Sequence, residues 1–158
     1  MNDALDQLAA GLDLPAPEHE GLRLAFGHAC VLRVQHLLEE PDVMHCLDVL
    51  GLFLQGRAGR DALAAAAQQA VRLANSHRGS ASIDGCGHAA VSASYAVANA
   101  LQGKALQAAS YAAYAAVYAQ GGSAAVADRG SFEPEFRWQC ASLQSLAASE
   151  RMMMEKSQ

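Results

Sequence analysis

The chain has 158 residues, a formal net charge of −5 and a composition in which 52% of the residues are hydrophobic. A chain of this length is expected to fold as one domain and to bury a core without disulfide or metal staples. The mildly acidic balance argues against a nucleic-acid binder that relies on phosphate contacts. The sequence has a single isoleucine, no threonine and a high alanine content, which disfavours β-structure and predicts an all-α fold.

The N-terminal segment, residues 1–20, is expected to form an arm or a short helix, with a helical stretch over 2–12 that two prolines end. Its first residues, MNDALDQLAAGLDLP, lack the basic stretch and the continuous apolar run of a secretory signal. The most apolar run of the chain, residues 108–119, is too short to span a bilayer. We therefore expect a cytoplasmic protein that does not associate with membranes.

The rest of the chain shows repeated three–four spacing of apolar residues, which is typical of helices packed in a bundle. Pro41 suits the first turn of a helix, and Gly56 suits the position that follows a helix end. Ser131 is expected to cap the last helix, and residues 152–158 are expected to fray. Including the N-terminal segment, six or seven helices in a single domain are expected; those after residue 20 are placed at 21–39, 41–56, 60–75, 87–101, 105–120 and 131–151.

Two consecutive helices in the middle of the chain carry rows of small residues. One row is Ala89, Ala93, Ala96 and Ala100, and the other is Ala105, Ala109, Ala112 and Ala116. Because small side chains let helix axes approach closely, the rows predict a tight antiparallel pair inside a compact bundle.

The segment FGHACVLRVQHLLEE, residues 26–40, places Arg33 and His36 inside an apolar helical stripe. A buried guanidinium needs a carboxylate or several carbonyls, since an unpaired buried charge is costly. Arg33 is therefore predicted to be mostly buried and paired, with three carboxylates as candidate partners: Glu39, Asp48 and Glu150. The alternative is that Arg33 and His36 line a pocket.

Metal binding and catalysis find little support in the spacing of polar residues. The histidines and cysteines that could act as ligands are His28, Cys30, His36, His45, Cys46, Cys86 and His88. They show neither CxxC nor HxxxH spacing, so no metal site is expected and the four cysteines are read as buried thiols. Asp84, Cys86 and His88 lie too close in sequence to converge on one point, and no phosphate-binding loop is present. We therefore expect no cofactor and no enzymatic activity.

Aromatic residues give the best candidates for a binding surface. Tyr111, Tyr114 and Tyr118 share one helix face, opposite the alanine row. They could simply pack against neighbouring helices, or they could face a partner. Trp138 lies well away from the expected core stripe of the last helix, which comprises Phe132, Phe136, Cys140, Leu143 and Ala147.

The run ACVLRVQHLLE resembles the signature of the fifth family of predicted bacterial immunity proteins, which accompany polymorphic toxins. Cys30, Arg33 and Val34 match that signature, whereas Leu32 stands where many members carry a glutamate. The resemblance extends from about Leu22 to Leu146. It includes the Gly87–His88 opening of the alanine-rich middle, the later Tyr-Ala stretch, and the Trp138–Gln139 pair.

The resemblance implies a mostly helical bacterial protein that binds a toxin domain and neutralises it. The acidic balance would suit a basic toxin. Candidate residues for the partner site or a pocket are Arg33, His36, Tyr111, Tyr114, Tyr118, Trp138 and Gln139. Two alternatives stay open: a helical regulatory or stress protein that acts as a homo-oligomer, and a bundle that binds a small ligand or a metal.

Overall fold

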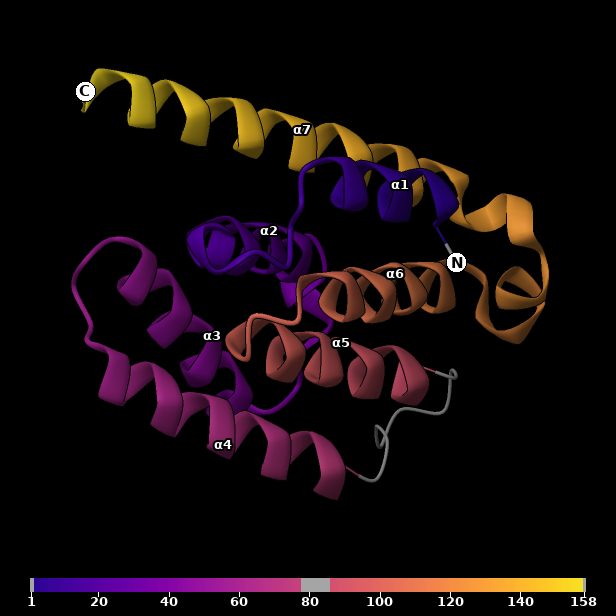
Figure 1. Cartoon of the computed structure of the whole chain (residues 1–158). Helices are drawn as coiled ribbons and strands as arrows, with labels where there is room; N and C mark the ends of the chain where they lie inside the picture. The colour runs from indigo at the N-terminus through magenta and orange to yellow at the C-terminus, as the bar shows by residue number, and fades with distance from the viewer. Residues whose placement is uncertain (1, 78–85, 158) are drawn as a thin grey trace.

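The structure is a computed structural model that describes residues 2–77 and 86–157, and this part of the chain is helical without any strand (Figure 1). The predicted all-α bundle is confirmed. The α-helices are α1 (Asp3–Gly11), α2 (Glu20–Leu32), α3 (Pro41–Leu54), α4 (Arg60–Ser76), α5 (Cys86–Leu101), α6 (Ala105–Ala127) and α7 (Glu133–Lys156). Short 3-10 helices, Pro17–His19, Gln35–Leu37 and Arg129–Phe132, connect some of them.

The two alanine-rich helices, α5 and α6, share the most extensive interhelical contact in the described chain, as their small-residue rows predict. All four alanines of the α5 row are buried, as are Ala105, Ala109 and Ala112 of the α6 row. Helix α2 packs on both helices, with Phe26 completely buried. An ideal Cβ on Gly27 would stand 3.2 Å from the Cα of Ala100, so only a glycine fits this crossing of α2 and α5 without a shift.

The remaining helices cover two sides of this centre. Helices α3 and α4 form a pair that packs on α5, and α7 runs along the opposite side with α1 against it (Figure 1). Helix α1 is held by the buried side chains of Leu5 and Ala9 and is followed by the buried Leu14. Asn2 caps α1 by accepting a hydrogen bond from the backbone N–H of Leu5 at 3.1 Å.

Several predicted boundaries are wrong, and each has a local cause. Helix α2 ends at Leu32 rather than near residue 39, because Val34 leaves the helical conformation (φ −120°) and buries its side chain in the core. Helix α6 continues past residue 120 to Ala127 across a kink at Gly122, where φ is +63°. Ser131 lies in a 3-10 helix, and Phe132 occupies the position before α7. Helix α7 reaches Lys156 because its end is rich in good helix formers such as Met, Glu and Lys.

Candidate partner-binding surface

Tyrosine side chains from α5 and α6 gather on one surface of the bundle. Tyr111 and Tyr114 are each 39% exposed, whereas Ala105, Ala109 and Ala112 on the other side of α6 are buried. We define the aromatic strip as Tyr95, Tyr111, Tyr114, Tyr118 and Phe132. Its members come from α5, from α6 and from the 3-10 helix before α7, so three elements position it.

The rings of the strip form two groups, and the rings within each group are in contact. Tyr95 stacks on Tyr111 with ring centroids 5.3 Å apart. Tyr114 packs against Tyr118 at 5.5 Å and against Phe132 at 6.4 Å. At its two margins the strip meets His88, 5.0 Å from Tyr118, and Phe136, 5.4 Å from Phe132. The strip is therefore a supported surface rather than a set of isolated exposed rings.

Two of the tyrosines have their hydroxyl groups engaged within the protein. The hydroxyl of Tyr95 donates to Oδ1 of Asn75 at 3.0 Å, and the hydroxyl of Tyr118 lies 3.0 Å from Oγ of Ser123. Tyr111 and Tyr114 make no hydrogen bond through their hydroxyls within the described residues. These two tyrosines thus offer both a ring and a polar group to a partner.

Arg33 is paired with a carboxylate, as predicted, but the partner is Glu135 and not Glu39, Asp48 or Glu150. The guanidinium donates from Nε to Oε2 at 2.9 Å and from Nη2 to Oε1 at 2.8 Å. This bidentate bond raises the pKa of Arg33.

The prediction that Arg33 is mostly buried is wrong, because its side chain is 37% exposed while that of Glu135 is 12% exposed. Arg33 caps the C-terminal end of α2 instead of lying inside a longer helix.

Trp138 lies directly beneath Arg33, so two candidates that stand far apart in the sequence come together. The guanidinium carbon is 4.4 Å from the centroid of the indole ring, which is a cation–π arrangement. Trp138 is half-buried and also packs against the core. His36, by contrast, is exposed in the 3-10 helix that follows α2 and does not share the Arg33–Glu135 contact.

Gln139 was a candidate for the partner surface or a pocket; it is not on the surface, but it lines a hollow of about 210 Å³ beside α1 and α6. Its side chain is 1% exposed; Nε2 donates to the carbonyl of Ala109 at 2.8 Å, and Oε1 accepts from Nδ2 of Asn2 at 3.3 Å. Gln139 therefore ties α7 to α6 and to the start of α1. The buried row of α7 is Glu135, Gln139, Leu143 and Ala147, whose four-residue spacing is visible in the sequence.

The expectation that all four cysteine thiols are buried is only partly met. Cys30 and Cys46 are buried, and burial raises the pKa of both, whereas Cys140 is half-buried. The side chain of Cys86 and the whole of Asp84 lie outside the described residues. Among the described side chains, no group of three His, Cys, Asp or Glu is placed to hold a metal ion.

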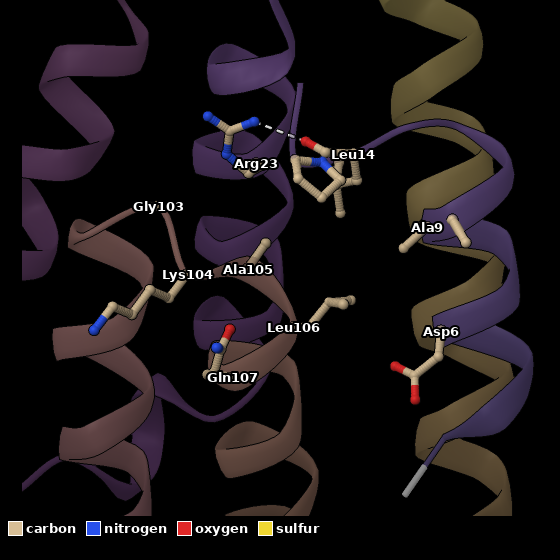
Figure 2. A pocket seen from close by; sticks show the side chains of 11 residues that line it. Asp6, Ala9, Leu14, Arg23, Gly103, Lys104, Ala105, Leu106 and Gln107 are labelled. Carbon is tan, nitrogen blue, oxygen red and sulfur yellow. Dashed lines mark hydrogen bonds between the residues drawn. The ribbon is translucent and has the colours of Figure 1, made fainter. Parts of the chain in front are cut away.

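A groove between α1 and α6 is a feature that sequence reasoning missed. It consists of a hollow of about 490 Å³ and a second hollow of about 210 Å³ that share Asp6, Leu106 and Gln107. Figure 2 shows Leu106 of α6 and Asp6 of α1 projecting into the gap between the two helices. Such a groove depends on how far α1 stands from α6, which no local pattern encodes.

The sequence matches no protein-family model and no curated protein, and the structure matches no solved structure. Within residues 2–77 and 86–157, no helix combines the length and apolar character that crossing a membrane requires.

Proposed function

We propose that this chain is a binding protein, without catalysis of its own, that recognises a protein partner through the aromatic strip. The observation that carries the proposal is the exposure of Tyr111 and Tyr114 on a surface braced by other rings. Tyrosine is among the residues that contribute most to protein interfaces, because a rigid ring buries a large area with little loss of side-chain entropy.

The partner we propose is a toxin domain, which the chain neutralises as an immunity protein. The support for this role is the resemblance at Cys30, Arg33 and Val34, together with the acidic balance of the chain. An acidic protein meets a basic partner faster than a neutral one does, and this advantage falls as salt screens the charges.

The test is co-purification with the product of the neighbouring gene, where that gene encodes a basic, toxin-like protein. The Tyr111→Ser/Tyr114→Ser double variant removes both exposed rings. We expect it to retain the fold and to weaken the complex by at least about tenfold, the usual effect of truncating interface anchors. The measurement is the dissociation constant, alongside survival of cells that express the toxin.

The chain offers a matched control at another pair of exposed apolar residues. Leu32 and Met44 are 41% and 39% exposed, close to the values for the two tyrosines. The Leu32→Ser/Met44→Ser variant should therefore bind the toxin as the wild type does. If both double variants bind equally well, or if no complex forms with the wild type, the proposal is wrong.

A further inference from the structure

The groove between α1 and α6 has a predominantly apolar lining. The larger hollow is lined by small or apolar residues of α1, of the segment after it and of α6: Ala9, Ala10, Leu14, Pro15, Ala105 and Leu106. The second hollow extends the groove toward Asn2, Ser110 and Phe136. Helix α1 has nine residues, so the groove runs beside about 13 Å of helix. That length matches the apolar face of a short helix better than a single extended side chain.

The charged groups along the groove are not equivalent. Arg23 and Lys104 line the larger hollow together with Asp6. Arg23 donates Nη1 to the carbonyls of Leu14 and Ala16, at 2.7 Å each, which uses its hydrogen bonds but leaves its positive charge in place. The side chain of Lys104 points away from α1 (Figure 2). The carboxylate of Asp6 points into the gap, and it forms no ion pair or side-chain hydrogen bond within the described residues. The charge that faces the gap without a hydrogen-bonded partner is therefore the negative charge of Asp6.

The wall of the groove that α1 forms belongs to the most acidic part of the chain. Residues 1–20 hold five of the 16 acidic residues and neither Lys nor Arg, so the other 138 residues are balanced, with 11 of each sign. The formal net charge of −5 is therefore that of residues 1–20, of which Asp6 lines the groove and Glu20 is paired with Arg60. This placement favours a cationic occupant.

We infer that the α1–α6 groove binds an amphipathic, Lys/Arg-rich helix of the protein partner. The apolar face of that helix would cover Leu106, Ala9 and Ala10, and one of its cations would pair with Asp6. This inference rests on the proposed function, since it assigns part of the partner to a second surface. The two surfaces adjoin, because Phe136 lines the second hollow and contacts Phe132 of the aromatic strip.

The probe is a fluorescein-labelled synthetic peptide of Leu and Lys, about four helical turns long, with all leucines on one face. Its counterpart carries Glu in place of every Lys. Fluorescence anisotropy on the full chain should show binding of the Lys peptide that weakens as salt is added, and no binding of the Glu peptide. Equal binding of both peptides would overturn the inference.

Paired substitutions in α1 and directly after it locate the peptide-binding site. Ala10 and Ala4 are both exposed on α1, but only Ala10 lines the groove. Ala10→Arg should weaken the binding of the Lys peptide by at least about tenfold. Ala4→Arg, with the same charge change, should weaken it by less than about twofold. Asp6→Asn should weaken the binding of the Lys peptide by about threefold, and Asp13→Asn, at a residue that does not line the groove, by clearly less. If the members of each pair behave alike, the peptide binds elsewhere and the inference is wrong.

The failure of this inference can be told apart from failure of the proposed function. The Tyr111→Ser/Tyr114→Ser variant should bind the Lys peptide as the wild type does, because neither tyrosine lines the groove. A tyrosine-dependent toxin complex without groove-dependent peptide binding would overturn the inference alone. A dimer of the wild type that Ala10→Arg abolishes would show that a second copy occupies the groove, which also overturns it.

Discussion

The contact between α5 and α6 and the contact between α1 and α7 are built from different side chains. Alanines such as Ala93, Ala96 and Ala109 fill the first contact, and they leave little room between the helices. The second contact combines the apolar Leu5 with a hydrogen bond from Asn2 to Gln139. Helix α1 packs on α7 but stands off from α6, which leaves the groove.

This difference separates stability from recognition. A close-packed crossing of small residues tolerates no added volume, because a larger side chain must displace the backbone opposite. A helix that stands off on one side leaves space for a partner, while its other side keeps it attached. We therefore expect substitutions in the centre of the bundle to act on folding, and substitutions along the groove and the aromatic strip to act on binding.

The largest effect is expected at the crossing of α2 and α5. Gly27→Val would place carbon atoms against the backbone of Ala100, where even a Cβ stands only 3.2 Å away. We expect a loss of about 3 kcal/mol in the free energy of unfolding, at the upper end for overpacking. The measurement is urea denaturation followed by circular dichroism.

Gly21→Val is the matched control for Gly27→Val. Gly21 lies at the start of the same helix, and a Cβ added there meets no atom within 4 Å. Because valine has a higher helix propensity than glycine, Gly21→Val should not lose stability. A similar loss in both variants would show that the crossing of α2 and α5 does not set the cost.

The next largest effect concerns Arg33→Ala, which removes the cation paired with the Glu135 carboxylate, whose side chain is 12% exposed in the wild type. Since the guanidinium itself is partly exposed, we expect a loss of about 2 kcal/mol, below the 3–5 kcal/mol of a fully buried pair. Arg60, whose partner is Glu20, provides an exposed comparison. Arg60→Ala should leave the unfolding free energy unchanged within error, and an equal loss in both variants would contradict the role of burial.

The sequence predicted the helical class, the alanine-rich pair and the shared face of the three tyrosines, because each depends on local composition and on 3.6-residue periodicity. It did not reveal the end of α2. Helix propensity alone does not show that Val34 and Leu38 reach the core only if the helix stops before them.

The sequence also did not predict which residues from distant segments of the chain contact each other. Arg33 and Glu135 are 102 positions apart, and the local sequence around either residue does not indicate the other as its partner. The buried Gln139 could have been recognised from its spacing to Glu135, Leu143 and Ala147. Phe132 and Phe136 instead predicted a more hydrophobic stripe, in which Gln139 has no place.

A smaller effect is expected in the pH dependence of stability. Burial lowers the pKa of His28, so the unfolded chain takes up a proton at a higher pH than the folded protein does. The contribution of neutral His28 to the free energy of unfolding is therefore fully present above the ordinary histidine pKa of about 6.5. It decreases as the pH falls below that value. Thermal melts between neutral and mildly acidic pH should show a shallower decline for His28→Gln than for the wild type.

The exposed His45 provides the control for that measurement. His45→Gln should decline with pH as the wild type does. If His28→Gln also follows the wild-type profile, the acid sensitivity of the fold comes from another group.

The smallest effect is expected at Gly51 in α3, which sharpens the contrast with Gly27. A Cβ on Gly51 would stand 3.3 Å from Nε2 of His28, the far end of a side chain that can turn aside. Replacing a helical glycine by alanine gains up to about 1 kcal/mol in propensity, and displacing the imidazole offsets part of that gain. Gly51→Ala should therefore raise the unfolding free energy by about 0.5 kcal/mol, and by about 1 kcal/mol in a His28→Ala background. A clear loss of unfolding free energy in both backgrounds would mean that α3 packs against α2 as tightly as α2 packs against α5. The contrast between a close-packed centre and more loosely packed outer helices would then not apply to this side of the bundle.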